Sequence, residues 1–313
     1  MYCLQNIRII LFIGCLFVLV ACRSSLSTDD HPVLKPLSFD GLENVYQYGE
    51  SIYGGSGPYT ESDFAELKRL GIDLVVSVDG AIPKVELAKA AGMRYAHIPI
   101  GYDGGSRETQ LQLVKALKIG NRIYVHCHHG VHRGPAAIAS LLVGIGVITN
   151  DEAVQILEFV GTSDQYQNLY HDVRTARVVS EEELAVVGAL PEVAEVSDFT
   201  RTMASVDVYW DHLKLSREAG WKAIPEHPDI DPVHEALMIH EQFRELLRQD
   251  METDYSEREL AELQDFRDYL KSATEQSAEL ESGLRQRAAV EYLETQYQAL
   301  KQSCVSCHDA YRN

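Results

Sequence analysis

Residues 125–134 read Val125-His126-Cys127-His128-His129-Gly130-Val131-His132-Arg133-Gly134, and this stretch decides the fold of the N-terminal half of the chain. The residues just before it, Arg122 to Val125, are typical of a short buried strand. The residues after it open an apolar helix, and Pro135 suits the first position of such a helix. The stretch therefore predicts a tight loop between a strand and a helix.

Such a loop gathers backbone N–H groups and the positive end of the helix dipole around one small bowl, which suits a tetrahedral dianion. The same field favours the thiolate form of Cys127. Arg133 can hold two anionic oxygens with its planar guanidinium. A thiolate beside a phosphate cradle is equipped to attack phosphorus. We expect the phosphate to be bound by the backbone of His128, His129, Gly130, Val131, His132 and Arg133.

The pattern His126-Cys127-x-x-Gly130-x-x-Arg133 resembles the signature of the cysteine-dependent protein phosphatases, and most closely that of the dual-specificity group. The resemblance implies an α/β domain with a central, mainly parallel sheet and flanking helices. It also implies hydrolysis of a phosphoester through a phosphocysteine intermediate without a cofactor, with phosphoproteins among the candidate substrates. The family usually has Ser or Thr after the arginine, where the hydroxyl helps the thiolate leave. This chain has Gly134 there, so the second half-reaction is the step to test.

A metal site is an alternative for the same loop, because His126, His128, His129 and His132 are crowded into it. Neighbouring residues of a loop point in different directions, however, which makes sequence neighbours poor candidates for one coordination sphere. We therefore favour the phosphate-binding interpretation.

Strands and helices alternate upstream of this loop, which favours an α/β sheet with its site at the strand ends. Cleavage of a phosphoester needs a general acid to protonate the leaving oxygen. In similar phosphatases an Asp on a loop upstream of the cysteine has this role, and Asp103 lies in the matching place. Asp103 also stands beside two glycines, where Asp commonly forms turns. Asp79, at another strand end, is the second candidate for the acid.

The N-terminus is typical of a targeting segment. Residues 9–20 form an apolar run that is short for a membrane span, and Leu19-Val20-Ala21-Cys22 resembles the lipobox of bacterial lipoproteins. The resemblance implies removal of residues 1–21, lipidation of Cys22 and a periplasmic protein anchored in the membrane of the cell envelope. An uncleaved membrane anchor is the alternative. We expect a tether over 22–36, the phosphatase-like domain over 37–175 and a linker over 176–198.

Residues 199–313 are expected to form an antiparallel four-helix bundle, because apolar residues recur there at steps of three and four. The last predicted helix contains Cys304-Val305-Ser306-Cys307-His308, which is the attachment signature of c-type haem. At this spacing the two thiols and the imidazole share one face of a helix. A redox or zinc-binding cysteine pair is the alternative, but zinc would need two further ligands that the sequence does not indicate.

The bundle with this motif at its end resembles cytochrome c prime and its relatives. The resemblance implies covalent haem on Cys304 and Cys307, with His308 as an axial iron ligand. In some relatives a methionine of the first helix is the sixth ligand, and Met203 is the candidate here, although a Met on an apolar face is commonly plain core. Haem of this type is attached outside the cytoplasm, in agreement with the lipoprotein signal.

The formal net charge of −19 argues against nucleic acid as a partner. We therefore predict a lipid-anchored phosphatase fused to a haem domain for electron transfer or for sensing of redox state or gas, with a possible redox partner. The alternative is a haem-binding electron-transfer or sensor protein whose phosphatase-like domain only binds anions.

Overall fold

A computed structural model describes residues 34–222, 224–248 and 257–311. The predicted signal, its lipidation site Cys22 and most of the tether lie outside these residues. The described residues belong to one compact unit. Among the described helices, none combines the length and the apolar character that crossing a bilayer requires.

The N-terminal half is built on a six-stranded sheet with the order β1-β2-β3-β6-β4-β5. Its strands are β1 (Lys35–Leu37), β2 (Val45–Gln47), β3 (Ile52–Gly55), β4 (Leu74–Ser77), β5 (Arg94–His97) and β6 (Ile123–His126). The neighbours β3, β6, β4 and β5 are parallel, whereas β1 and β2 are antiparallel additions at one edge. The mainly parallel α/β sheet expected from the sequence is confirmed, with the Cys127 strand in its middle.

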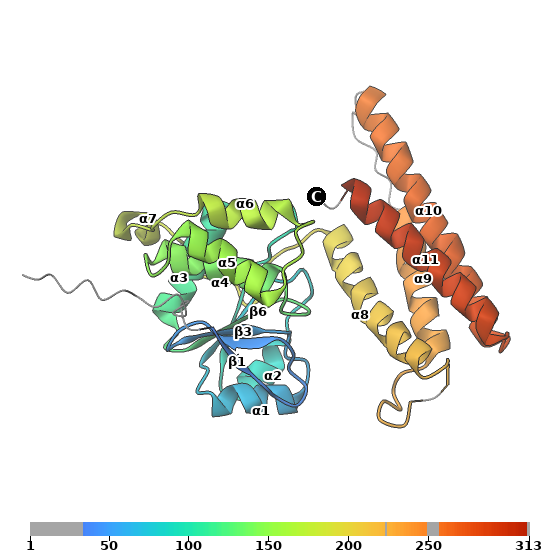
Figure 1. Ribbon diagram of the computed structural model, residues 1–313, viewed down its shortest axis with the longest axis horizontal. Helices are drawn as coiled ribbons and strands as arrows, with labels where there is room; N and C mark the ends of the chain where they lie inside the picture. Colours follow the sequence, from blue (N-terminus) through green and yellow to red (C-terminus); the bar gives the residue numbers. More distant parts are fainter. Residues whose placement is uncertain (1–33, 223, 249–256, 312–313) are drawn as a thin grey trace, which may run out of the picture. The chain divides into compact units, whose positions relative to one another are not determined.

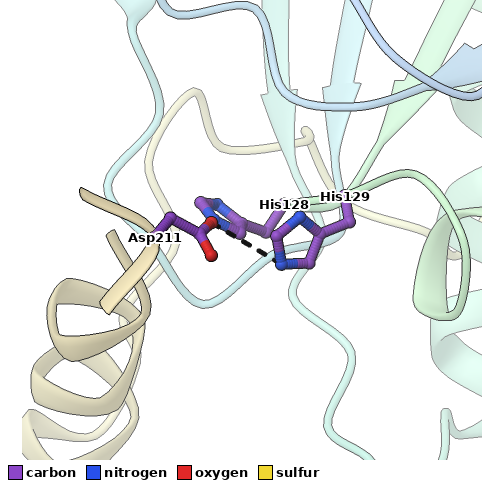
Figure 2. Close-up of side chains that lie close together, drawn as sticks. All are labelled: His128, His129 and Asp211. Carbon is purple, nitrogen blue, oxygen red and sulfur yellow. Dashed lines mark hydrogen bonds and ion pairs between the residues drawn. The ribbon is translucent and has the colours of Figure 1, made fainter. Parts of the chain in front are cut away.

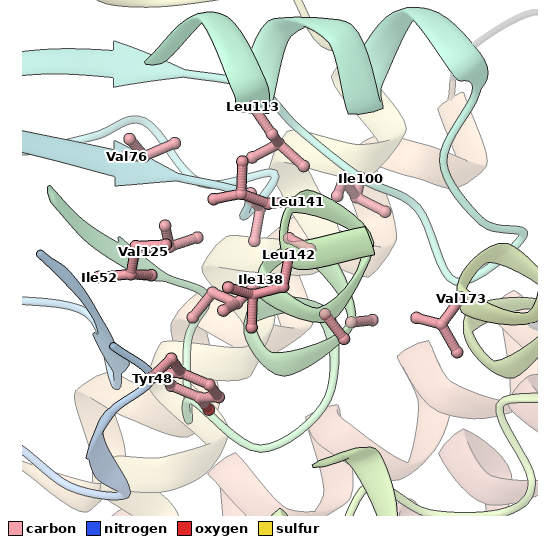
Figure 3. Close-up of a cluster of buried hydrophobic side chains, with 14 of the residues drawn as sticks. Tyr48, Ile52, Val76, Ile100, Leu113, Val125, Ile138, Leu141, Leu142 and Val173 are labelled. Atoms are coloured by element: carbon pink, nitrogen blue, oxygen red, sulfur yellow. The ribbon is translucent and has the colours of Figure 1, made fainter. Parts of the chain in front are cut away.

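Helices cover both faces of this sheet (Figure 1). One face packs against α3 (Arg107–Ile119), α4 (Arg133–Gly144), α5 (Asn150–Val160) and α6 (Gln167–Thr175), and the other against α1 (Glu61–Arg69) and α2 (Val85–Ala90). Successive residues of β6 serve opposite faces, since Val125 joins the first core and Tyr124 the second. Figure 3 shows Val125 of β6 with Ile138 and Leu141 of α4 in the first core. These two cores hold the end of β6 and the start of α4 in a fixed relation.

Helix α4 begins at Arg133, two residues earlier than the sequence suggested. Pro135 is therefore the third residue of the helix and not the first. Proline is tolerated there because the first N–H groups of a helix have no partner within the helix. The consequence is that Arg133 and Gly134 belong to the rigid first turn, close behind the loop.

The segment between the two halves lies along the phosphatase-like half. It contains the short helix α7 (Glu181–Ala185). The Arg107 guanidinium donates to the carbonyls of Arg177 and Val178, at 2.8 and 3.0 Å, and pairs with Glu183. The N–H of His97 donates to the carbonyl of Pro191 at 2.8 Å. These contacts hold much of the segment against α3 and the β5 edge.

The C-terminal half consists, within the described residues, of α8 (Asp198–Glu218), α9 (Pro232–Arg248), α10 (Glu257–Arg285) and α11 (Val290–Tyr311). All four contribute to one apolar core, as the periodicity predicted. The indole of Trp210 on α8 stacks on Tyr297 of α11, with 4.6 Å between ring centroids. Cys304, Cys307 and His308 lie near the end of α11.

Candidate functional site

The loop between β6 and α4 is shaped by partners that hold its carbonyl groups from outside. The N–H of Gly57 donates to the carbonyl of His128 at 3.0 Å, and the Asn44 amide donates to that of His129 at 2.8 Å. The Thr162 hydroxyl donates to the carbonyl of Val131 at 2.6 Å. Because a trans peptide places C=O and the next N–H on opposite sides, these bonds turn N–H groups of the loop toward its interior. The loop is thereby set up to bind an anion.

Gly130 is required for this shape. It has a φ of +74°, and a Cβ there would lie 2.3 Å from the carbonyl carbon of Gly55 and 2.5 Å from the nitrogen of Ser56. Both of those atoms are backbone atoms at the end of β3, so they cannot move aside as a side chain could. The glycine of the motif thus lets the loop pack directly on the neighbouring strand.

Cys127 follows β6 directly and is buried, with 3% of its surface exposed. A Cβ built on Gly134 would lie 3.5 Å from the Cys127 nitrogen and 3.6 Å from its Sγ, which is ordinary van der Waals contact. The position after the arginine therefore faces the nucleophile candidate, and it has room for a small side chain.

Arg133 is buried and its side chain has one donor without a partner. Its Nη2 lies 3.3 Å from Oδ2 of Asp79, and its guanidinium carbon lies 4.8 Å from the centre of the Tyr102 ring. Within the described part of the chain, the Nε of Arg133 is the buried side-chain nitrogen or oxygen that lacks a hydrogen-bond partner. An unsatisfied buried donor costs free energy unless a ligand completes it. An anion in the loop would do so.

The two acid candidates differ in environment. Asp79 is buried at the end of β4. Burial disfavours its charged form, but the Arg133 charge and the N–H of Ala81 outweigh this and hold the pKa of Asp79 below its usual value. Asp103 is exposed in a turn at 101–104, and it lines the same cavity as Arg133 and Asp79. Asp172 of α6 anchors this turn by accepting the N–H of Gly105 at 2.5 Å.

The four histidines of the loop have separate surroundings. His126 is buried, and its Nε2 lies 2.5 Å from the Tyr95 hydroxyl. His132 packs edge-on against Tyr166. His128 and His129 come together instead, with ring centroids 4.3 Å apart, and Asp211 of α8 meets both (Figure 2). The expectation that loop neighbours point apart is therefore wrong for this pair. Asp211 gave no signal in the sequence, because it stands 82 positions after His129 and carries no motif.

The residues of the predicted haem-attachment motif line a cavity of about 810 Å³. Cys304, Cys307 and His308 of α11 and Met203 of α8 border it, and apolar side chains of the other helices complete the wall. These are Ile239, Phe243, Phe266 and Leu270. A wide apolar cavity beside two thiols and an imidazole fits a haem group. The same cavity extends to Asp79, Asp103, His128 and Arg133.

The cysteine pair does not have the surroundings of a zinc site. Burial raises the pKa of the Cys304 thiol to about 12 and also raises that of Cys307. Zinc binds thiolates and usually takes four ligands in a structural site. In the described ranges, no third His, Cys, Asp or Glu gathers with these two cysteines into a possible metal site.

Two family models match the chain. Residues 48–147 match the model described as "Polymorphic toxin system, DSP-PTPase phosphatase", and residues 231–312 match that of cytochrome C′, which indicates haem as a cofactor. No curated protein matches the chain.

Several solved phosphatase structures are similar to part of the chain. TpbA of P. aeruginosa is 20% identical with a TM-score of 0.41, and the match covers 50% of this chain and 97% of TpbA. A putative phosphatase from Shewanella putrefaciens is 20% identical with a TM-score of 0.37, covering 44% of this chain and 95% of its own. The catalytic domain of the PP-IP phosphatase SIW14 from S. cerevisiae is 18% identical with a TM-score of 0.36, covering 44% and 88%. The family models thus match a DSP-type phosphatase over residues 48–147 and cytochrome c′ over residues 231–312.

Proposed function

We propose that the N-terminal domain hydrolyses phosphoesters through a phosphocysteine intermediate. The observation that carries this proposal is the unpartnered Nε of Arg133, buried beside a loop in which the carbonyls of His128, His129 and Val131 are bound by groups outside the loop. A phosphate in the loop would accept from that Nε and from the inward amides. Cys127 lies behind the same loop, where its sulfur can reach phosphorus.

In the proposed reaction the Cys127 thiolate attacks phosphorus and forms an S–P bond while the bond to the leaving oxygen breaks. The amides of residues 128–133 and the Arg133 guanidinium hold the three remaining oxygens. Asp103 gives its proton to the leaving oxygen. We assign this role to Asp103 because Asp79 is paired with Arg133, which holds the pKa of Asp79 below its usual value and makes it the poorer proton donor. Water then hydrolyses the phosphocysteine and releases inorganic phosphate and the thiolate.

We further propose that the C-terminal domain holds haem through thioethers at Cys304 and Cys307, with His308 on the iron and Met203 as the candidate sixth ligand. When bound, the haem would supply a one-electron couple and an iron centre for a small gas molecule. The chain is proposed to stand outside the cytoplasm, anchored by lipid on Cys22, because covalent haem attachment and the lipobox-like segment both favour that compartment. A phosphoprotein substrate and a redox partner belong to the same proposal.

An anion-binding sensor domain is the second candidate, and Gly134 favours it because a hydroxyl that usually assists thiolate departure is missing. The test compares the wild type, Cys127→Ser and Arg133→Lys on an artificial aryl phosphate. If the domain is an enzyme, we expect turnover in the wild type. Turnover should fall at least about 10³-fold in both variants, because Cys127 and Arg133 act only together. Undiminished turnover in Cys127→Ser would end the phosphocysteine proposal. Phosphate binding without wild-type turnover would favour the sensor.

A further inference from the structure

The side chains of His128, His129 and Asp211 form a cluster that neither proposed function uses, because phosphate binding involves only the backbone of the two histidines. Nε2 of His128 lies 2.8 Å from Oδ2 of Asp211, and Nε2 of His129 lies 3.7 Å from the same oxygen (Figure 2). The three ligand atoms all lie within 4.8 Å of one another. Ligands at 2.0–2.2 Å from a tetrahedral Zn²⁺ are separated by about 3.3 Å, so small side-chain rotations would close this group on one ion.

Neighbouring groups orient each part of the cluster. The Tyr59 hydroxyl lies 2.8 Å from Nδ1 of His128, which leaves Nε2 of that ring directed at Asp211. Lys214 donates to Oδ1 of Asp211 at 2.6 Å, which leaves Oδ2 directed at both histidines. Metal ligands are commonly oriented in this way by hydrogen bonds from a surrounding layer of residues. Because these two contacts orient ligand atoms toward one another, the three side chains form a pre-oriented site.

We propose that His128, His129 and Asp211 bind a divalent transition-metal ion of the zinc class. Two imidazoles and one carboxylate suit Zn²⁺, which in sites with three protein ligands keeps a fourth position for water or an anion. On binding, the metal ion would take the place of the proton that His128 and Asp211 share. The metal would join the phosphate-binding loop to α8, the helix that also carries Met203. It would thus tie the two proposed sites together.

The probe is Zn²⁺ alone, titrated by calorimetry into the full haem-loaded chain. We expect one ion per chain and a Kd raised at least ten-fold by Asp211→Asn and by His129→Ala. Asp207→Asn is the matched control, because Asp207 lies one turn earlier on α8 and contributes charge near the histidines without belonging to the cluster. That variant should change Kd by less than about three-fold. If Asp211→Asn and Asp207→Asn weaken zinc binding equally, the effect is one of general electrostatics, and the proposed site is wrong.

The Cys127→Ser variant excludes capture of zinc by the nucleophile candidate. It should bind Zn²⁺ as the wild type does, and X-ray absorption at the zinc edge should show two imidazoles and no sulfur. Sulfur in that spectrum, or zinc binding lost in Cys127→Ser, would overturn the proposal. These readouts do not depend on hydrolysis, so failure of the phosphatase proposal leaves them intact. Circular dichroism of each variant shows that the fold is retained.

Discussion

Arg133 and Asp79 meet at the carboxyl edge of the sheet, with 3.3 Å between Nη2 and Oδ2. Arg133 comes from the first turn of α4, and Asp79 follows β4. The pair keeps the guanidinium in place and keeps Asp79 ionised, because the two buried charges stabilise each other. This contact is the reason why we propose Asp103, and not Asp79, as the general acid.

We expect Asp103→Asn and Asp79→Asn to differ in how their effect depends on the leaving group. Asp103→Asn should lower kcat by about 10²-fold or more for a phosphoester with a poor leaving group, and little for an activated aryl ester, because only the former needs the proton. Asp79→Asn should raise KM for both substrates alike, since it loosens Arg133. Steady-state kinetics on the two substrates measures this. A leaving-group dependence in Asp79→Asn alone would move the acid role to Asp79.

Gly134→Ser should speed the second half-reaction. The Cβ position of residue 134 lies 3.6 Å from Sγ of Cys127, so a serine there fits and brings its hydroxyl to the departing sulfur. The wild type should release its first product in a burst and accumulate phosphocysteine, while Gly134→Ser should show a smaller burst and a higher steady rate. Gly134→Ala adds the same Cβ without the hydroxyl and serves as the control. A linear wild-type time course with no trapped intermediate would contradict this prediction.

The haem ligands can be separated by substitution. Cys304→Ala with Cys307→Ala should leave no haem attached after denaturation, because both thioethers are removed. Met203→Ala should keep the covalent haem and change the iron absorption spectrum, since Met203 lines the same cavity as His308. Met238→Ala is the control, a methionine of α9 that does not line the cavity. Identical spectra in Met203→Ala and the wild type would show that Met203 is core only.

Asp73 should make the stability of the phosphatase domain depend on pH. Burial opposes its ionisation, but the N–H groups of Arg122 and Asn121 and the Arg94 guanidinium outweigh this and lower the pKa of Asp73. A carboxyl with a lower pKa when folded stabilises the fold above its unfolded pKa, about 3.9, and this contribution is lost as the pH falls through the folded value. Asp73→Asn should therefore cost about 1–2 kcal/mol at pH 7 and less below pH ~4.

Urea unfolding of the full chain at both pH values, followed by a probe in the phosphatase domain, measures the Asp73 effect. Asp40→Asn is the control, because Asp40 is exposed. If Asp73→Asn lowers the free energy of unfolding equally at both pH values, the substitution acts through packing or hydrogen-bond geometry and not through the lost charge.

Several elements followed from local sequence alone. The Thr60 and Asp63 pair forms a complete capping box at the start of α1, and Gly71 and Gly92 adopt positive φ just after the ends of α1 and α2. The β6–loop–α4 unit lies where the motif predicted it. The start of α4 was misplaced because Pro135 is acceptable at more than one position of a first turn, and in the structure it is the third residue.

The sequence by itself determined the two domain types, because the Cys-x-x-Gly-x-x-Arg loop and the Cys-x-x-Cys-His helix each combine chemistry and local geometry within a few residues. It also determined which faces of most helices are apolar. Only the tertiary structure decided which carboxylate meets Arg133, and that His128 and His129 converge on Asp211. Those contacts join residues far apart in the chain, and they depend on how buried charges find partners when the elements pack. Local periodicity carries no information about that choice.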